Sequence, residues 1–437
     1  MNILKAGEKI LSTLNKAGYS AYFVGGYVRD KMMGNTPSDI DIATAALPDE
    51  VKRLFDHTID TGLKHGTVTV ILDGIPFEVT TYRVEDSYEN HRKPKFVKFV
   101  SDIEKDLSRR DFTINAMAYH FKDGLIDPFG GKNDIKNKII RCVGNPLKRF
   151  EEDALRMLRC VRFACQTNFE IEENTLCAIK EKAHLLEFIS KERIFTELVK
   201  SLTAKYPEHL KVCYETGLFE YFLPEMSICF ETPQNTIYHL YNVGEHILKA
   251  VCKTPRDKVV RLSAFFHDIG KPLCRTTDEF GSDHFKGHEQ KGAELTNEIL
   301  KRLKCDNKTR ESVCKIIACH RWTKTPSMKS VKEKIIDVGK ENFQNLLYLM
   351  EADTSAHNLD AVKSRVQAMR EVREIYEEIL EKNHPLDFND LNISGDDLIS
   401  MGYSGKEIGE KLNTALCMVL EDAKLNSKEI LTERLKK

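Results

Sequence analysis

The apolar and polar positions of this chain follow two patterns, one typical of a small sheet and one typical of helices. Over residues 2–17, apolar side chains recur at helical spacing, which predicts an amphipathic helix. The two β-rich runs that follow later, 67–72 and 77–82, flank Asp73-Gly74, a strong hairpin signal. Shorter strand signals stand at residues 22–24 and 40–42. Roughly the first 120 residues therefore predict a mixed α/β region with a small sheet.

The remainder of the chain is predicted to be mainly helical. Residues 83–98 are polar and lack periodicity, so we expect a mobile loop beside the sheet. The turn cluster at residues 127–131 marks an edge of the first region. Beyond about residue 145, strand patterns fade and helical patterns dominate. The sequence thus predicts an α+β fold, with an α/β head followed by a long all-α body.

Composition and charge restrict the function classes. Of the 437 residues, 41% are hydrophobic and 30% are charged, as in an ordinary soluble globular protein. No stretch approaches the ~18 consecutive apolar residues of a membrane span, and the N-terminus lacks an apolar signal core, so we expect a cytoplasmic protein without a membrane partner. The net charge of −1 argues mildly against nucleic acid, leaving only a local basic surface for such a partner. The twelve cysteines form no CxxC motif, which disfavours a zinc ribbon.

A pair of acidic residues near the N-terminus carries the first candidate chemistry. Asp39 and Asp41 flank Ile40, and in an extended strand their carboxylates would project to one face and share divalent cations. Gly25 and Gly26 precede them and would let the backbone approach a phosphate closely. This combination favours phosphoryl or nucleotidyl transfer with Mg²⁺. Glu78 is a third carboxylate if its strand lies beside Ile40; the alternative for the acidic pair is a solvated turn.

Two arginine-rich segments follow. In the first, we expect Asp106 to cap a helix, with Arg109 and Arg110 placed for phosphate or ribose contacts; the alternative is a cluster of salt bridges at a helix start. In the second, helical spacing would place Asp153 and Arg156 on one face, either as a surface ion pair or as a reader of a nucleobase. A carboxylate accepts from the exocyclic amine of cytosine or adenine, and the guanidinium donates to the neighbouring ring acceptor. Further along the helix, two more arginines could reach phosphate or ribose: Arg159 and Arg162.

These segments together resemble a known family. GGYVRD, SDIDIAT, RRDFTINAM, DPFGGKNDI and EDALRMLRCVRF occur in this order and resemble the class II tRNA nucleotidyltransferases, the CCA-adding enzyme family, closely over residues 20–200. The resemblance implies a polymerase-beta-like nucleotidyltransferase head with a small mixed sheet, then an elongated all-α neck, body and tail. The implied boundaries are residues 1–140, 141–225, 226–370 and 371–437.

The resemblance also implies an activity and residue roles. The activity is template-independent addition of C, C and A to the tRNA 3′ end from CTP and ATP with Mg²⁺. Residues 83–98 match in position a flexible loop that helps the switch from C to A, and residues 393–409 resemble, more weakly, a tail that grips the tRNA elbow. The implied roles are metal binding by Asp39 and Asp41, phosphate and sugar contacts by Gly26, Arg29 and Arg110, and base reading by Asp153 and Arg156 with help from Arg159 and Arg162.

A second candidate site lies in the helical part. The adjacent pair His267-Asp268 stands in an apolar helical run, where ionisable groups need partners or metal. This pattern resembles the HD phosphohydrolase superfamily, which implies one or two divalent transition-metal ions, with Asp268 bridging, and hydrolysis of a phosphoester by metal-activated water. His246 is our choice for the first ligand because an apolar helical run follows it, and His239 remains an alternative. The later ligands of this set are His288, His320 and Asp353. The other histidines that we weighed are interpreted as surface or structural: His57, His65, His91, His184 and His284.

Several functions therefore stay open. The nearest alternatives are a poly(A) polymerase and an enzyme that adds only C or only A. Alternatives of other classes are an HD phosphohydrolase with a nucleotide-sensing head and a non-catalytic RNA-binding scaffold. The sequence leaves open the oligomeric state, the HD-site metal and the RNA-contacting surface.

Overall fold

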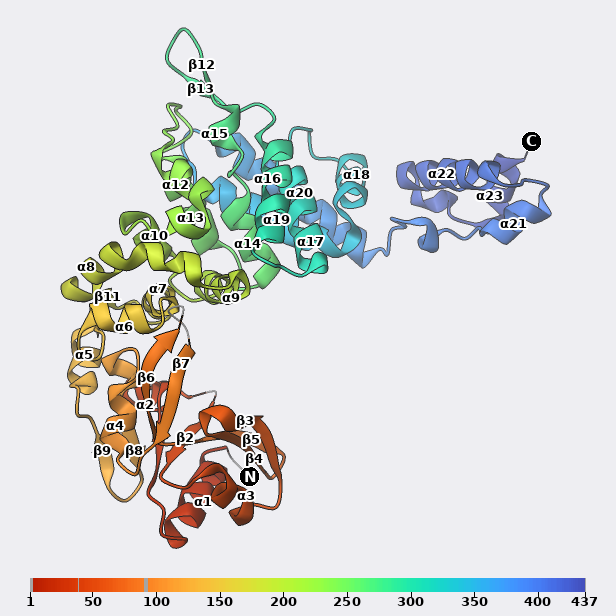
Figure 1. The fold of residues 1–437 in the computed structure, drawn as a ribbon. Coiled ribbons are helices and arrows are strands. Elements are labelled where there is room, and N and C mark those ends of the chain that lie inside the picture. The colour runs from red at the N-terminus through yellow and green to blue at the C-terminus, as the bar shows by residue number, and fades with distance from the viewer. Residues whose placement is uncertain (1–2, 38, 90–92, 437) are drawn as a thin grey trace. The chain divides into compact units, whose positions relative to one another are not determined.

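The computed structural model describes residues 3–37, 39–89 and 93–436. It divides into two compact units, Met1–Pro224 and Glu225–Lys437, which are described separately (Figure 1). The first unit is a mixed sheet with helices, and the second is built almost entirely of helices. This confirms the predicted α+β class, while the finer division into four domains stays a prediction.

A seven-stranded sheet organises the first unit, with strand order β3-β4-β5-β2-β1-β8-β9. Strands β2 and β5 pair in parallel, and the other neighbours pair antiparallel. Asp73 and Gly74 both have positive φ, 52° and 77°, as a tight hairpin turn between β4 and β5 requires. The predicted hairpin is therefore confirmed. The strands of the sheet are β1 (Ala21–Val24), β2 (Asp41–Thr44), β3 (Thr58–Gly62), β4 (Thr67–Leu72), β5 (Ile75–Thr81), β8 (Ala118–His120) and β9 (Gly124–Ile126).

The amphipathic N-terminal helix covers this sheet. Helix α1 (Ile3–Lys16) buries Ile10, Leu11 and Leu14 in one core cluster with Phe23 of β1 and Val79 of β5. Burial of each such side chain contributes about 1.5–3 kcal/mol. Two short helices complete this side of the unit: α2 (Gly26–Met32) and α3 (Pro48–Leu54).

The segment expected to be a mobile loop is a hairpin instead. Strands β6 (Arg83–Glu89) and β7 (Lys93–Phe99) pair antiparallel, from Arg83 opposite Phe99 to Glu89 opposite Lys93 (Figure 1). The prediction of a loop was wrong because the sequence of this segment shows no clear strand periodicity, and the pairing of its two halves is visible only in the structure. His91 and its two neighbours, residues 90–92, lie outside the described residues.

Helices make up most of the rest of the first unit, together with a two-stranded parallel sheet of β10 (Ile139–Ile140) and β11 (Glu170–Ile171). The cap of α4 (Ile103–Ser108) is Asp102, whose side chain accepts from the backbone N–H of Glu104, so the predicted cap Asp106 is wrong. Asp106 lies inside this helix and is buried. The remaining helices are α5 (Gly131–Asn137), α6 (Pro146–Glu152), α7 (Leu155–Thr167), α8 (Glu173–Lys182), α9 (Lys191–Leu202), α10 (Lys211–Glu215) and α11 (Phe219–Phe222).

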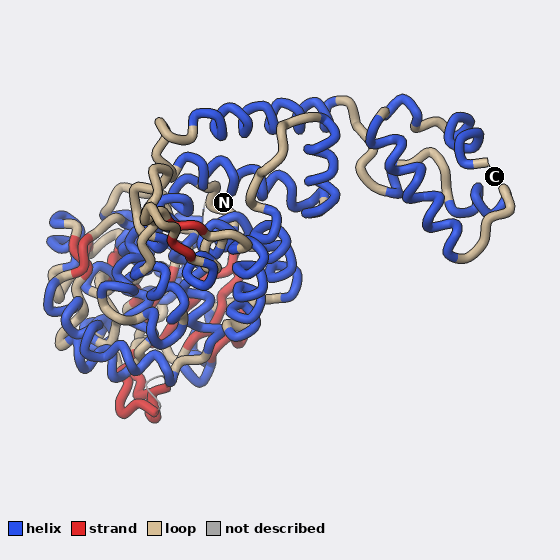
Figure 2. The backbone as a smooth tube through the Cα atoms, turned by 90° about the horizontal axis from the view of Figure 1, so that it is seen from above, coloured by secondary structure: helices blue, strands red, loops and turns tan. Residues whose placement is uncertain are grey.

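The second unit is helical with one short hairpin, β12 (Thr276–Thr277) and β13 (Asp283–His284). Its last three helices, α21 (Gly395–Ser400), α22 (Lys406–Glu421) and α23 (Lys428–Leu435), share a separate apolar cluster, and Figure 2 shows this C-terminal part as helices and loops. In the part of the chain that the structure describes, no helix is long and apolar enough to cross a membrane. The earlier helices are α12 (Pro224–Glu231), α13 (Val243–Lys253), α14 (Lys258–Phe266), α15 (Lys271–Cys274), α16 (His288–Arg302), α17 (Asn307–Cys319), α18 (Met328–Val338), α19 (Lys340–Ser355) and α20 (Lys363–Glu381).

Candidate active sites

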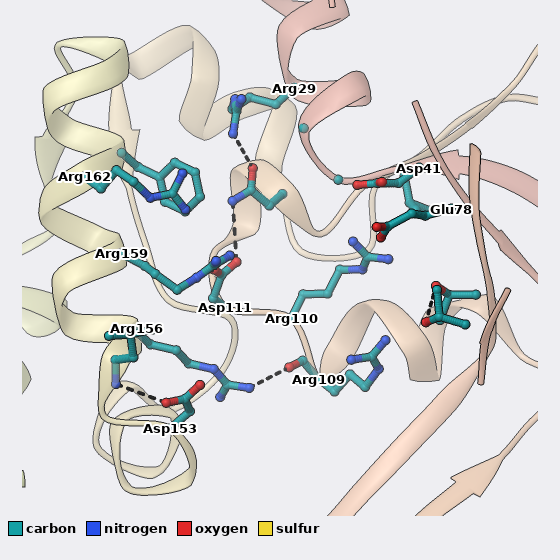
Figure 3. Close-up of a pocket in the computed structure, with 18 of the residues that line it drawn as sticks. Arg29, Asp41, Glu78, Arg109, Arg110, Asp111, Asp153, Arg156, Arg159 and Arg162 are labelled. Carbon is teal, nitrogen blue, oxygen red and sulfur yellow. Dashed lines mark hydrogen bonds and ion pairs between the residues drawn. The ribbon is translucent and has the colours of Figure 1, made fainter. Parts of the chain in front are cut away.

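A polar cavity of about 520 Å³ lies in the first unit, between the sheet and helix α7 (Figure 3). Eight of its lining residues are arginines and four are acidic, so the cavity favours an anionic ligand. The cavity is thus locally basic, although the net charge of the whole chain is −1. The arginines are Arg29, Arg83, Arg109, Arg110, Arg156, Arg159, Arg162 and Arg193, and the acidic residues are Asp41, Glu78, Asp111 and Asp153.

Two carboxylates stand side by side at the sheet edge of this cavity. Asp41 of β2 is in register with Glu78 of β5, and Figure 3 shows their carboxyl groups next to each other. Although Asp41 reaches solvent, desolvation by the surrounding protein raises its pKa, Glu78 and Asp39 raise it further, and Arg110 lowers it. A divalent cation would relieve this repulsion, so the residues fit a Mg²⁺ site.

Asp39 lies outside strand β2, which begins at Asp41, and it is exposed. Both aspartates nevertheless line a second cavity, of about 500 Å³. The structure thus brings the predicted pair to one cavity, although only one member belongs to the strand.

The two predicted glycines lie beside this carboxylate. Gly25 has φ 67°, a conformation that favours glycine. A Cβ at Gly25 would lie 3.2 Å from Nη1 of Arg110 and 3.6 Å from Oδ2 of Asp41. The missing side chain therefore leaves room for a ligand between the acidic edge and the arginines, and Gly26 lines both cavities.

Buried Asp106 organises three of the arginines. Its carboxylate accepts hydrogen bonds from the backbone N–H of Arg83 at 3.2 Å, from Nε of Arg109 at 3.0 Å and from Nη2 of Arg110 at 3.2 Å. Burial alone would raise the pKa of Asp106, but the two neighbouring guanidinium groups hold it below its usual value. Nε of Arg110 is buried without a hydrogen-bond partner among the described residues, so a donor remains for a ligand.

Asp111 has the same function for the arginines on the other side of the cavity. Nε of Arg159 donates to the carboxylate of Asp111 at 2.8 Å (Figure 3). Asn115 links Asp111 to Arg29: its side-chain amide donates to Asp111, and its Oδ1 accepts from Nη1 of Arg29 at 2.9 Å. Burial would raise the pKa of Asp111, but Arg159 and the backbone N–H of Phe112 bring it to about 2. Sequence reasoning assigned no role to Asp111 or Asn115, although both stand in the RRDFTINAM segment.

The expected base-reading pair is arranged differently from the prediction. Helix α6 ends at Glu152 and α7 begins at Leu155, so Asp153 lies between them and does not share a helical face with Arg156. Arg156 pairs with Glu152 at 2.7 Å and donates to the backbone carbonyl of Arg109 at 3.1 Å. Asp153 and Arg156 both line the cavity, as do Arg159 and Arg162.

Helix α9 supplies the ion-pair partners of Asp153 and Arg162, and the sequence analysis gave these two α9 residues no definite role. Arg193 binds Asp153 at 2.8 Å, and Glu197 binds Nε of Arg162 at 2.6 Å. The spacing of four residues that puts Arg193 and Glu197 on one face of α9 is the signal that could have identified them.

The second unit contains a cavity of about 840 Å³ beside a cluster of histidines and aspartates. Among the described residues, three groups have ligand atoms close enough to hold a metal ion. Asp268 belongs to two groups, and so does His246, while His239 joins only the group with His357. The groups are His246, His267, Asp268 and Asp353; Asp268, His288 and His320; and His239, His246 and His357.

The orientation of the histidines suits metal binding. Nδ1 of His267, His288 and His320 lies 2.8, 2.7 and 2.7 Å from a backbone carbonyl three residues earlier, which leaves each Nε2 for a ligand. Burial lowers the pKa of His320 to about 3, which keeps its imidazole neutral, the form that binds metal. Nε2 of His267 and Oδ2 of Asp268 are buried and lie 3.2 Å apart, so imidazole and carboxylate donors converge and the donor set fits divalent cations.

Five elements bring this set together. His246 lies on α13, His267 and Asp268 follow α14 directly, His288 begins α16, His320 follows α17 and Asp353 lies on α19. Atoms of the set lie close: Nε2 of His246 is 2.9 Å from Oδ1 of Asp353, and Nε2 of His288 is 3.4 Å from Oδ1 of Asp268.

Three further residues at this site were missed by the sequence reasoning: His357, Lys271 and Arg365. Nζ of Lys271 lies 2.7 Å from Oδ2 of Asp268, and Arg365 pairs with Asp353. His357 stands four positions after Asp353, a spacing that could have indicated it.

Family models match three regions of the chain. They are the "Poly A polymerase head domain" over residues 21–141, the "Probable RNA and SrmB- binding site of polymerase A" over residues 168–229, and the "HD domain" over residues 236–350.

Relatives named CCA-adding enzymes are similar to this chain over its whole length or over about half of it. The CCA-adding enzyme of Ligilactobacillus salivarius (strain UCC118) is 35% identical over 438 residues, which cover 99% of this chain and 96% of that protein. The CCA-adding enzyme of Geobacillus sp. (strain WCH70) is 52% identical over 213 residues, 48% of this chain and 53% of that protein.

Solved structures of CCA-adding enzymes are similar to the fold of this chain. The CCA-adding enzyme of Bacillus stearothermophilus in complex with CTP superposes with a TM-score of 0.72 at 29% identity, covering 99% of this chain and 98% of that one. The Thermotoga maritima CCA-adding enzyme complexed with tRNA gives a TM-score of 0.56 at 24% identity, over 99% of this chain and 95% of that one, which is a likeness of fold.

Proposed function

The chain belongs to the CCA-adding enzyme family, and on that premise we propose that it is a nucleotidyltransferase that adds C, C and A to tRNA 3′ ends from CTP and ATP. The observation that carries the proposal is the arginine-lined cavity with Asp41 and Glu78 at its edge. Its charge suits a nucleoside triphosphate, and its carboxylates suit the cation that accompanies one.

The chemistry follows from this arrangement. The arginines of the cavity would bind the triphosphate, and Asp39 and Asp41, with Glu78 beside them, would hold Mg²⁺. The cation would lower the pKa of the RNA 3′ hydroxyl and neutralise charge on the leaving group. The bond between this oxygen and the α-phosphorus forms as the bond to pyrophosphate breaks, and the hydroxyl proton passes to water.

Asp153 and Arg156 would choose the base. The carboxylate of Asp153 can accept from the exocyclic amine that cytosine and adenine share, and Arg156 can donate to the adjacent ring nitrogen. Uracil and guanine present a carbonyl where the amine would be, and Asp153 would repel it. This supports the use of CTP and ATP without a nucleic-acid template.

The test is the product formed on a tRNA that ends at its discriminator base. With both CTP and ATP, the expected product is three nucleotides longer and ends in CCA; with CTP alone, extension stops after C, C. A homopolymer of A would overturn the proposal in favour of a poly(A) polymerase. Absence of any extension would favour the phosphohydrolase or scaffold alternatives.

We propose a second function for the HD region, hydrolysis of a phosphoester with one or two bound divalent transition-metal ions. The observation that favours it is that Asp268 belongs to two adjacent ligand groups, one with His246, His267 and Asp353 and one with His288 and His320. Mixed imidazole and carboxylate ligands suit ions such as Mn²⁺, Fe²⁺, Co²⁺ or Zn²⁺. Lys271 and Arg365 would then be available for a phosphate, because metal would take over their present carboxylate partners.

A further inference from the structure

His239, His246 and His357 form a group at the HD centre that contains no carboxylate. Their ligand atoms lie within 4.8 Å of one another. The ring centroids of His239 and His357 are 4.4 Å apart, and the ring of His246 lies 5.1 Å from the first and 4.9 Å from the second. The two other ligand groups of this centre both contain Asp268, so this all-imidazole group differs from them in chemistry.

The spacing of the three rings suits one metal ion. With a metal–nitrogen distance of about 2.1 Å, imidazoles on a common tetrahedral ion have ring centroids about 5 Å apart. Two ligands of the proposed HD set, His288 and His320, show a similar distance of 5.2 Å. A metal ion could therefore join the three histidines with little rearrangement of the surrounding helices.

Backbone contacts hold His239 beside His357. His239 lies in the loop between α12 and α13, and His357 follows the end of α19. The backbone N–H of Asn358 donates to the carbonyl of Tyr238 at 2.9 Å, and the side-chain amide of Asn358 donates to the carbonyl of Ile237 at 3.3 Å. These bonds join the residues next to the two histidines, and they fix the two imidazoles side by side.

Each of the three histidines has a nitrogen for a ligand. Nδ1 of His357 lies 2.7 Å from the backbone carbonyl of Asp353, which leaves Nε2, as in three histidines of the HD set. Nδ1 of His239 and Nδ1 of His246 are buried without hydrogen-bond partners among the described residues. The contact of 3.5 Å between Nη1 of Arg365 and Nε2 of His357 is long for a hydrogen bond, and a metal ion would displace it.

We infer that His239, His246 and His357 bind a further transition-metal ion, next to the ions of the groups that contain Asp268. The inference deepens the proposed HD function and rests on it. Nε2 of His246 lies 2.9 Å from Oδ1 of Asp353 and serves the Asp268 groups, so Nδ1 is the atom that His246 offers to the further ion. An imidazole that binds two metal ions releases its remaining N–H proton to the solvent.

The donor atoms select the kind of metal and its role. Three imidazoles suit Zn²⁺, Co²⁺ or Ni²⁺ and disfavour Mg²⁺ and Ca²⁺, which prefer oxygen ligands. Three protein ligands also leave a fourth tetrahedral position open. His239 and His357 line the cavity of about 840 Å³, so a water molecule or a phosphate oxygen of the substrate can take this position.

The experiment counts metal ions in the full chain. The protein is loaded with Co²⁺ in the presence of excess Mg²⁺, which occupies the carboxylates of the first unit, and is dialysed before elemental analysis. His239→Ala and His357→Ala should each hold one Co²⁺ ion fewer per chain than wild type, and the double variant should lose no more than either. His239→Gln, which retains most of the side-chain volume, should lose the same ion. His284→Ala, a change of an exposed histidine at the same cavity, is the matched control and should keep the wild-type content.

Proton release is a second readout. Calorimetric titration with Co²⁺ in buffers of different ionisation enthalpy should show one more proton released by wild type than by His239→Ala, because the further ion displaces the N–H proton of His246. Loss of one ion without this difference in protons would place His239 among the ligands of the Asp268 groups and would overturn the inference.

Equal Co²⁺ content in wild type and His239→Ala would also overturn the inference, and so would the loss of more than one ion in the double variant. The two proposals fail differently. A wild-type protein that binds Co²⁺ but does not hydrolyse p-nitrophenyl phosphate would overturn the proposed hydrolysis, whereas the metal counts above overturn the further site alone.

Discussion

The carboxylate of Asp153 is held by Arg193, 40 positions further along the chain, with distances of 2.8 Å from Nη2 to Oδ2 and 3.3 Å from Nη1 to Oδ1. This two-point contact fixes the plane of the carboxylate at the wall of the arginine-lined cavity. The backbone N–H of Leu155 also donates to it, at 3.1 Å. Asp153 is therefore oriented before any nucleotide binds, and its orientation depends on helix α9.

Removal of Arg193 should weaken nucleotide binding and base choice together. In Arg193→Ala we expect KM for CTP and ATP to rise about tenfold, because Asp153 loses its orientation and the cavity loses a positive charge. Incorporation of UMP should increase relative to CMP. Steady-state kinetics with each of the four nucleoside triphosphates measures both effects.

Lys200→Ala is the control for that experiment, since it removes one positive charge from an exposed position on the same helix. It should leave both KM values unchanged. If Arg193→Ala raised KM without any change in base selection, Arg193 would serve the triphosphate and would not orient Asp153.

Loss of one HD ligand should separate the two proposed activities. His267→Ala should lower the bound Mn²⁺ or Co²⁺, measured by elemental analysis after dialysis, and abolish hydrolysis of p-nitrophenyl phosphate, because the two ligand groups share Asp268 beside it. Addition of CMP to tRNA should persist. His284→Ala, which removes an exposed histidine at the same cavity but outside the three ligand groups, should keep both metal and hydrolysis. Metal content that survives His267→Ala would contradict the ligand assignment.

Packing of the HD segment against α16 depends on Gly270. A Cβ at Gly270 would lie 2.5 Å from the backbone carbonyl of His288 and 2.5 Å from the backbone nitrogen of Gly292, so something must shift. Gly270→Ala should lower the free energy of unfolding by about 2 kcal/mol and reduce metal retention, because it displaces His288 from Asp268. Chemical denaturation and metal analysis provide the two measurements.

Gly292→Ala is the matched change on the opposite side of this contact. A Cβ at Gly292 would lie 3.4 Å from the nearest atom, which is an ordinary contact. In the interior of a helix, alanine is more favourable than glycine by about 1 kcal/mol. It should therefore leave the unfolding midpoint unchanged or raise it. Equal destabilisation by the two variants would contradict the close approach at Gly270.

Asp111 should contribute to stability against acid. Its folded pKa of about 2 lies below the ordinary value of 3.8, so its ion pair with Arg159 stabilises the fold above that value and is lost as pH falls from about 4 toward 2. In Asp111→Asn, the decrease in unfolding free energy over this interval should be smaller by about 2 kcal/mol. Denaturant unfolding at pH 7, 4 and 2 measures this difference, and an acid profile identical to wild type would contradict the assignment.

The sequence predicted the sheet for a physical reason, and the residues expected as HD ligands lie together in the structure. Strands such as Thr67–Leu72 are half buried and alternate clearly, and the turn at Asp73-Gly74 requires positive φ. Adjacent His267 and Asp268 in an apolar segment indicate a partner or metal even before their neighbours in space are known. Family resemblance then selected the later histidines without any knowledge of the packing.

What the sequence did not reveal depended on tertiary contacts. The sequence of the β6–β7 segment has no clear strand periodicity, and neither glycine nor proline stands at the break between α6 and α7 at Asp153. Asp106 was taken for a cap because its role as the common partner of three arginines arises only when β6 and α4 meet. Arg193 and His357 are likewise defined by their partners and not by their local sequence.

The central claim is that Asp41 holds the cation at the triphosphate while RNA is extended, and the most direct measurement is a crystal structure with Mn²⁺ and a non-hydrolysable CTP analogue. Anomalous scattering should place Mn²⁺ in contact with the carboxylate of Asp41 and with triphosphate oxygens, the triphosphate lying among the arginines. A bound triphosphate with Asp41 turned away and no cation between them would contradict the account.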